Sequence, residues 1–161
     1  MRPNEAPDRL WKSISMDFIT DLPLSAGSDA VLIVIDRLTK MAHFIASTKD
    51  KNARQFQETF IREIFRLHGL PGDIITDRGS IFTSDLWKET TKKLGMERRV
   101  STAFNPQTDG QMRRTNSTLK DHLRAYINYQ QDDWKQLLPM AEFAYSNGYQ
   151  ESVKYTPFFA N

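Results

Sequence analysis

"WKSISMDFITDLPLSAGSDAVLIVIDRLTKMAHFIAS" occupies residues 11–47 and decides the fold. It contains three runs of strand-forming residues, at 11–20, 30–38 and 40–47, with short turns between them. The middle run is continuously apolar, which is typical of a strand buried at the centre of a sheet. Three successive strands with such short links predict an antiparallel meander.

The spacing of apolar residues changes after residue 47, from the strand period to the helix period. Helices are predicted where apolar residues recur every three or four positions, and short strands lie between them. The predicted helices span 52–69, 84–95, 112–131 and 132–147, and the predicted strands span 74–76 and 96–101, with a loop over 102–111. This order predicts an α/β fold with a mixed five-stranded sheet, a three-strand antiparallel meander plus crossovers, flanked by helices.

The composition is that of a single globular domain over residues 1–161. Hydrophobic residues make up 39% of the chain and charged residues 26%, a balance that excludes a disordered chain. The absence of cysteine excludes disulfides, thiolate catalysis and cysteine-zinc sites. His43, His68 and His122 do not share metal-ligand spacing within a helix. Because no apolar run is long enough for a membrane span, we expect no membrane partner.

Positive charge is concentrated in one part of the chain. Residues 88–124 carry nine Lys or Arg and four Asp or Glu, whereas the whole chain has a net charge of only +2. Such an uneven distribution favours a surface that binds a polyanion. A solvated helix face would give the same pattern, and the charges alone do not decide between the two interpretations.

Two aspartates stand where a site can form in such a sheet. Asp17 lies within the first predicted strand, between Met16 and Phe18, and Asp77 follows the strand at 74–76. Sites of α/β sheets gather at strand ends. Two aspartates that meet there offer the hard oxygen ligands that Mg²⁺ prefers. Taken singly, each aspartate is more typical of a turn or a cap.

Six phrases of the sequence carry a family resemblance. They are "SMDFITDLP" (15–23), "DRLTKMAHFI" (36–45), "IFRLHGLP" (64–71), "ITDRGSIFTS" (75–84), "STAFNPQTDGQ" (101–111) and "NYQQDDWKQLLPMAEFAYSN" (128–147). Together, and in this order, they resemble the integrase core of gypsy-type (Metaviridae) long-terminal-repeat retrotransposons, within the retroviral integrase superfamily. The resemblance covers 11–161 and implies an RNase H-like fold. It also implies DNA 3′-end processing and strand transfer.

The resemblance implies a catalytic triad of two Asp and one Glu, with 35 residues between the last two. Its first Asp matches Asp17 in "SMDF", and its second matches Asp77 in "TDRGS". With 35 residues between them, the position that follows Asp77 in this spacing is Arg113, in "PQTDGQMRRTN", where the family reads like "PQTDGQTERVN". In the family the carboxylates hold two Mg²⁺ or Mn²⁺ ions that clamp the attacking and leaving oxygens. An arginine cannot ligate a metal, so we expect weakened metal binding and little or no strand transfer.

The helix that follows is predicted to bind DNA. Arg113, Ser117, Lys120 and Arg124 recur on one polar stripe, and Arg114 adds a further cation beside it. Cations along a helix edge can follow DNA phosphates. Two milder departures lie near the expected site: Asn105 replaces a family histidine, and Ile81 replaces a glutamine.

Alternative functions remain open at this point. One is an active polynucleotidyl transferase whose third ligand comes from another acid: Glu97, Asp109, Asp121 or Asp36. Another is a protein-binding or scaffold module that a host has co-opted. The resemblance implies nuclear location and three partners: DNA (retroelement ends and target DNA), a second copy of the chain as a homodimer, and a host chromatin protein. The zinc-binding domain before such a core, and the DNA- or chromatin-binding domain after it, are expected to be absent from this chain.

Overall fold

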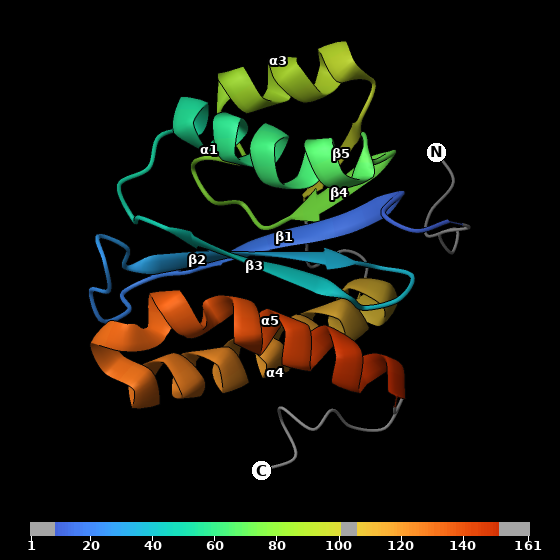
Figure 1. Cartoon of the computed structure of the whole chain (residues 1–161). Helices are drawn as coiled ribbons and strands as arrows, with labels where there is room; N and C mark the ends of the chain where they lie inside the picture. The colour runs from blue at the N-terminus through green and yellow to red at the C-terminus, as the bar shows by residue number, and fades with distance from the viewer. Residues whose placement is uncertain (1–8, 101–105, 152–161) are drawn as a thin grey trace.

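The computed structural model describes residues 9–100 and 106–151, and it describes side chains within 9–100 and 117–146. Its centre is one five-stranded sheet covered by helices on both faces (Figure 1). Within these described ranges, no helix is long and apolar enough to cross a membrane.

The sheet confirms the predicted mixed architecture. Its strands are β1 (Ser13–Ile19), β2 (Ala30–Asp36), β3 (Ala42–Ser47), β4 (Asp73–Thr76) and β5 (Glu97–Val100). They lie in the order β3-β2-β1-β4-β5. The pairs β1–β2 and β2–β3 are antiparallel and form the predicted meander, whereas β1–β4 and β4–β5 are parallel. The parallel pairs place the ends of β1 and β4 at the same edges of the sheet.

The helices form two layers, one on each face of the sheet (Figure 1). The elements are α1 (Ala53–Phe60), η1 (Ile61–Phe65), α2 (Arg66–His68), α3 (Asp85–Leu94), α4 (Pro106–Gln130), η2 (Gln131–Asp133) and α5 (Trp134–Glu151). A capping box between Asn52 and Gln55 begins α1, and Gly95, with a φ of 75°, ends α3 in the left-handed conformation that glycine favours.

The start of α4 differs from the prediction. The loop was expected to continue to residue 111, but the helix already begins at Pro106. A proline is well suited to the first turn because it needs no hydrogen-bonded N–H there and its φ is preset for a helix. The helix therefore includes Gly110, which lay within the predicted loop.

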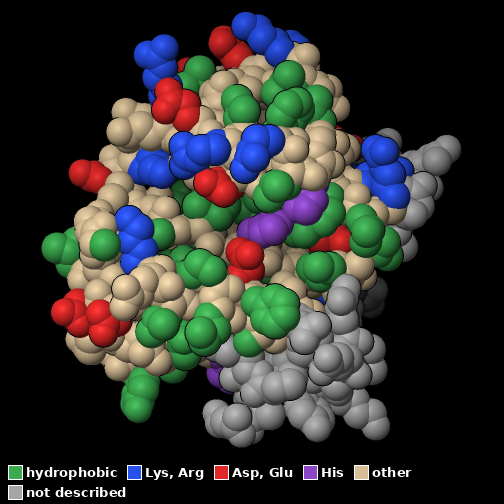
Figure 2. All heavy atoms as spheres, in the orientation of Figure 1, with side chains coloured by type: hydrophobic (Ala, Val, Ile, Leu, Met, Phe, Trp, Pro, Cys, Tyr) green, Lys and Arg blue, Asp and Glu red, His purple; other side chains and the backbone are tan. Residues whose placement is uncertain are grey.

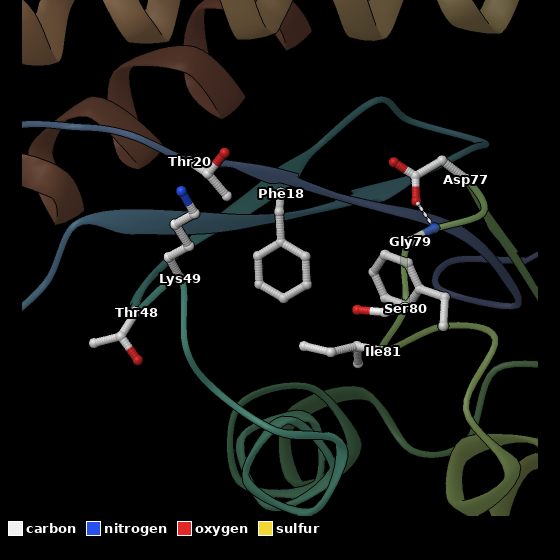
Figure 3. Close-up of a pocket in the computed structure, with 9 residues that line it drawn as sticks. Phe18, Thr20, Thr48, Lys49, Asp77, Gly79, Ser80 and Ile81 are labelled. Carbon is white, nitrogen blue, oxygen red and sulfur yellow. Dashed lines mark hydrogen bonds between the residues drawn. The ribbon is translucent and has the colours of Figure 1, made fainter.

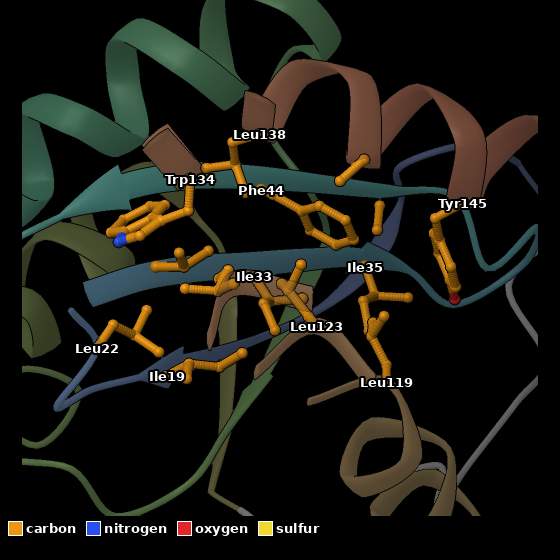
Figure 4. Packing of buried hydrophobic residues seen from close by; sticks show 14 residues of the cluster. Ile19, Leu22, Ile33, Ile35, Phe44, Leu119, Leu123, Trp134, Leu138 and Tyr145 are labelled. Carbon is orange, nitrogen blue, oxygen red and sulfur yellow. The ribbon is translucent and has the colours of Figure 1, made fainter. Parts of the chain in front are cut away.

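Strand alternation divides the core into two parts. Ile14 and Met16 of β1 point to one face and pack with Phe56, Phe60 and Trp87 of the helices above it. The opposite face packs on α4 and α5 (Figure 4). Its buried residues include Ile19, Ile33, Phe44, Leu119, Leu123, Trp134, Leu138 and Tyr145. Because side chains alternate along a strand, Asp17 lies on the same face as Ile19, toward α4.

Candidate functional site

Asp17 lies near the carboxyl end of β1, on the face that α4 covers. Its Oδ1 accepts a hydrogen bond of 2.8 Å from the Phe18 backbone N–H, and its Oδ2 accepts one of 3.1 Å from Lys120 Nζ. The Asp17 side chain is 20% exposed, so the carboxylate is neither fully buried nor open to water. Each oxygen of this carboxylate thus has a hydrogen-bond donor from the chain.

Asp77 follows β4 directly and is exposed at the same edge of the sheet. Its Oδ1 accepts a hydrogen bond of 2.8 Å from the Gly79 backbone N–H (Figure 3). A Cβ at residue 79 would lie only 3.0 Å from that oxygen, so glycine lets the loop fold tightly around the carboxylate. The parallel pairing of β1 with β4 brings Asp77 to the edge where Asp17 lies.

The electrostatics of Asp17 depend on burial and on its charged neighbours. Burial raises the pKa of Asp17 above its ordinary value, and the nearby charge of Asp77 adds to the rise. The Lys120 ammonium opposes this rise through its charge and its hydrogen bond. Two acids that share one edge, with a lysine as counter-charge, form an anionic site suited to a cation.

Two of the residues predicted to bind DNA lie against β1. Lys120 contacts Asp17, and Arg124 donates a hydrogen bond of 3.0 Å to the Thr20 carbonyl oxygen. Ser117 is exposed. Arg113 and Arg114 belong to α4, but their side chains lie outside the described residues. The predicted stripe on α4 therefore runs along the carboxylate edge, at least over 120–124.

The substitute third ligands lie apart from this edge where they can be placed. Asp36 is fully buried at the end of β2, and Glu97 begins β5 beside Asp73, at the opposite end of the sheet. Asp121 is exposed on α4, and the Asp109 side chain lies outside the described residues. Within the described side chains, no three His, Asp or Glu groups converge as a metal site. A Mg²⁺ ion often takes only one or two carboxylates and completes its shell with water and phosphate, so Asp17 and Asp77 are the residues at this edge to consider as its ligands.

A cavity of about 280 Å³ adjoins Asp77. Figure 3 shows the Phe18 ring pointing into it, with Lys49 and Ile81 on either side. Phe18, Thr20, Thr48, Lys49, Asp77, Gly79, Ser80, Ile81 and Phe82 line this cavity. Its mixed lining of aromatic rings, hydroxyls and one ammonium can accept both an apolar ring and an anionic group.

Sequence reasoning missed the contact between Lys120 and Asp17, although a signal was present. Position 120 lies seven residues after 113, about two helical turns, so both share one face of α4. Because the resemblance matches 113 to a metal-ligand position, it also implies that the face shared with 120 is directed toward the carboxylates. The stripe interpreted as a DNA surface thus also contains the counter-ion of Asp17.

Two histidines that are far apart in the sequence meet at the edge strand β3. His43 Nε2 lies 2.8 Å from His68 Nε2, and His43 Nδ1 lies 3.3 Å from a carboxylate oxygen of Glu142. The Trp11 ring stacks on both imidazoles. The ring centroids of the two histidines are 5.0 Å apart, so the Nε2 atoms face each other head-on, as in an N–H···N hydrogen bond. Twenty-five positions separate these residues, and no local pattern predicts their meeting.

Comparison with known proteins now identifies the relatives of the chain. No protein-family model matches it. It is 36% identical over 158 residues to the Transposon Tf2-3 and Tf2-4 polyproteins of Schizosaccharomyces pombe. This match covers 98% of the chain but only 12% of each polyprotein.

Solved structures with the same fold are integrases of retroviruses. The catalytic core domain of BIV integrase matches with a TM-score of 0.60 at 18% identity, over 84% of this chain and 83% of that one. The simian T-cell lymphotropic virus intasome in complex with PP2A regulatory subunit B56 gamma matches with a TM-score of 0.63 at 16% identity, over 89% of this chain and 54% of that one.

A third structure is the HTLV-2 integrase catalytic core domain in complex with magnesium, in a trimeric form. It matches with a TM-score of 0.52 at 18% identity, over 72% of this chain and 71% of that one. The five-stranded sheet and its two helical layers are therefore those of the RNase H-like integrase core. The chain is a homologue of a segment of the Tf2 retrotransposon polyproteins, and it has the fold of the retroviral integrase catalytic core.

Proposed function

We propose that the chain is the catalytic core of a gypsy-type retrotransposon integrase that binds DNA at the Asp17–Asp77 edge and that has lost most of its strand-transfer activity. The observation that carries the proposal is the arrangement of the two aspartates. They stand at the carboxyl ends of neighbouring parallel strands, and α4 brings cations against the same edge. The similarity to a retrotransposon polyprotein supports the same interpretation.

Asp17 and Asp77 would hold Mg²⁺ or Mn²⁺, which when bound supplies charge stabilisation at phosphorus during an in-line displacement. The HTLV-2 core with magnesium supports this choice of ion. The residues of the chain then position the DNA. Cations of α4 contact phosphates, and the cavity beside Asp77 offers aromatic surface next to the site.

Arg113 is the reason to expect impaired chemistry. Thirty-five residues separate it from Asp77, and it occupies the position where the family has a metal-binding glutamate. A fixed cation there supplies no ligand and repels a bound ion. At about 5 Å and an effective dielectric of about 20, two unit charges repel by roughly 3 kcal/mol, and a divalent ion by about twice that. An active enzyme with a substitute ligand is the competing hypothesis.

Replacing Arg113 by glutamate tests the proposal directly. We expect Arg113→Glu to raise Mn²⁺ affinity at least about tenfold, equivalent to about 1.4 kcal/mol, as measured by isothermal titration calorimetry. Strand transfer with oligonucleotide ends should rise with it. Arg114→Glu is the matched control, because it makes the same charge change at the next residue. Equal gains in both variants, or none in either, would contradict the role assigned to Arg113.

DNA binding separates the integrase core from a protein-binding scaffold. If α4 contacts phosphates, the DNA affinity should fall steeply with salt, with a slope of about 0.9 for each phosphate neutralised. A scaffold predicts weak binding without such a slope. A host chromatin partner and nuclear location belong to the same proposal, and co-purification with chromatin from nuclei tests both.

Self-association through the β3 side of the molecule is part of this proposal. A groove of about 530 Å³ lies there between β3, η1, α2 and α5, and the three helical elements also expose large apolar side chains. They are Ile61, Phe65, Leu67, Met140 and Phe143, the last being 71% exposed. Figure 2 shows hydrophobic side chains gathered around the histidines on this face. The groove also carries Arg62 and Glu63, charges of both signs, as a self-complementary interface between two copies requires.

Sedimentation of matched surface variants tests the homodimer. Phe143→Ser should shift the protein toward monomer, because an exposed aromatic at an interface centre contributes strongly to association. Tyr129→Ser removes an equally prominent aromatic, 83% exposed, on α4 away from the groove, and should leave the mass unchanged. A monomeric parent protein at all concentrations would exclude this interface.

A further inference from the structure

We propose that Lys120 exchanges partners: it is the counter-ion of Asp17 in the ion-free protein and passes to a DNA phosphate when a divalent cation binds Asp17. This inference rests on the proposed function and adds a regulatory coupling to it. Its basis is the ion pair of 3.1 Å between Lys120 Nζ and Asp17 Oδ2, which joins α4 to β1 across 103 residues of sequence.

The ion pair and a bound cation compete at Asp17. The Oδ1 of Asp17 already accepts the Phe18 N–H, and its Oδ2 is the oxygen that Lys120 contacts. A Mg²⁺ ion binds a carboxylate oxygen at about 2.0–2.1 Å. An ammonium that stayed within 3.1 Å of the same oxygen would therefore lie within about 5 Å of a doubly charged ion. Charge repulsion at this distance therefore favours the departure of Lys120 when a cation binds.

The Lys120 side chain can move away from Asp17, whereas the Arg124 side chain is held in place. Lys120 is 31% exposed, and it lies beside Leu119 and Leu123, which are buried and fix α4 on the sheet. The ammonium can therefore move on its flexible stem without any movement of the helix. Arg124, one turn further, is fastened to the Thr20 carbonyl by a hydrogen bond of 3.0 Å, a contact that cation binding does not disturb.

Once released, Lys120 remains at the edge where DNA would lie. Binding of the divalent cation and binding of DNA therefore become coupled. A divalent cation at Asp17 frees one phosphate-binding charge, and a phosphate that holds Lys120 frees Asp17 for the cation. By linkage, each ligand must raise the affinity for the other by the same factor. The ion-free protein, in contrast, keeps this charge neutralised and binds DNA with one cation fewer.

Asparagine variants of the two aspartates separate partner exchange from simple charge removal. Binding of a short fluorescein-labelled DNA duplex is measured by anisotropy over a range of salt, with EDTA present. Asp17→Asn removes a negative charge and frees Lys120, whereas Asp77→Asn removes a neighbouring charge and leaves the ion pair intact. We expect Asp17→Asn to gain several-fold more affinity than Asp77→Asn, with a salt slope steeper by about 0.9. Adding Lys120→Met to Asp17→Asn should abolish that extra gain.

A second measurement needs no DNA. Lys120→Met should raise the affinity of the protein for Mn²⁺ alone by roughly five- to tenfold in calorimetry, since the competing ammonium is gone. Lys93→Met, on exposed surface of α3, is the control and should change nothing. Circular dichroism verifies that each variant is folded.

The outcomes distinguish the coupling from the function on which it rests. DNA binding with equal gains for Asp17→Asn and Asp77→Asn, or an unchanged Mn²⁺ affinity in Lys120→Met, would overturn the exchange of partners alone. No salt-dependent DNA binding by any variant would overturn the proposed function, and the exchange with it.

Discussion

Two pairs of aspartates lie at opposite ends of the same sheet and have contrasting surroundings. Asp17 and Asp77 lie at the carboxyl ends of β1 and β4. Asp36 and Asp73 lie at the other end, where their strands pair with the start of β1. All four are acids on adjacent strands, so the difference lies in what surrounds them.

The second pair is held by several groups of the chain. Asp36 is fully buried and accepts hydrogen bonds from the Trp11 N–H at 3.1 Å and from the Thr39 hydroxyl at 2.7 Å. Asp73 accepts the Ser13 hydroxyl at 3.0 Å, and the same oxygen lies within 4 Å of Arg37 and Arg99. These carboxylates hold the ends of neighbouring strands together, and the chain itself supplies their donors and countercharges.

The first pair keeps capacity unused. Asp77 is exposed and Asp17 half-buried, and the one ion pair of Asp17 is with a flexible lysine. A ligand site in this sheet is therefore marked by carboxylates whose hydrogen-bonding capacity the chain uses only in part. The two ends of the sheet should then respond differently to loss of a carboxylate.

The largest effect is expected at Asp36. Asp36→Ala would leave the buried Trp11 N–H and the Thr39 donors without an acceptor, at a cost of about 3 kcal/mol in unfolding free energy. For a chain of this length the melting temperature should fall by roughly 10 °C. Thermal unfolding measures it, with Asp50→Ala in an exposed turn as control. A loss as small as that of the control would break the distinction between the two ends.

A smaller loss is expected at Asp73. Asp73→Asn keeps an acceptor for the Ser13 hydroxyl but leaves the partly buried Arg37 and Arg99 without their shared countercharge. We expect a loss of about 1–2 kcal/mol in urea unfolding. Glu97→Gln is the matched control, because it removes the other acid beside Arg99 from a more exposed position, and it should cost less.

Asp17→Asn should change stability least among the aspartate variants. Burial raises the pKa of Asp17, so its charge is a cost to the folded protein that asparagine removes. The lost pair with Lys120 is partly exposed and worth at most about 1 kcal/mol. We expect urea unfolding to show no change, or a slight gain, within about 1 kcal/mol. A loss of unfolding free energy as large as that in Asp36→Ala would show that Asp17, like Asp36, serves to hold the fold together.

The sequence predicted the sheet and its two candidate ligands because both depend on local patterns. Alternation in β1 and the continuous apolar run of β2 specified the meander, and Asp77 directly follows a short strand. The count of 35 residues to Arg113 came from a resemblance, not from physics.

What the sequence did not show depends on the rotation and contacts of elements far apart in the chain. Lys120 meets Asp17 only because Leu119 and Leu123 orient α4 on the sheet. Asp36 ends β2, and nothing nearby in the sequence indicated that it accepts a hydrogen bond from the Trp11 N–H. The meeting of His43 with His68 likewise depends on how α2 returns to β3.

The pair His43–His68 is a third kind of ionisable group, which differs from both pairs of aspartates. It also has the smallest expected effect on stability. The pKa of His68 is lowered because burial and the neighbouring His43 both disfavour its charged form, against the pull of Asp36. In the neutral pair, His43 donates through Nδ1 to Glu142 and accepts the His68 N–H at Nε2. Protonation of both rings would place two N–H groups head-on at 2.8 Å.

The sign of the pH dependence follows from that lowered pKa. Folded protein binds fewer protons at His68 than unfolded protein does, so this contribution to stability is complete above about pH 6.5 and declines as the pH falls below it. His68→Phe keeps an aromatic ring against Trp11 but cannot be protonated, so its unfolding free energy should fall less between about pH 7.5 and about pH 5.5 than that of the parent protein. His122→Phe, which removes an imidazole from an exposed position of α4, tests whether loss of any histidine has this effect. An equal pH dependence in His68→Phe and the parent would show that the pair His43–His68 tolerates a second proton. Contact between two imidazole rings would then not by itself make stability depend on their titration.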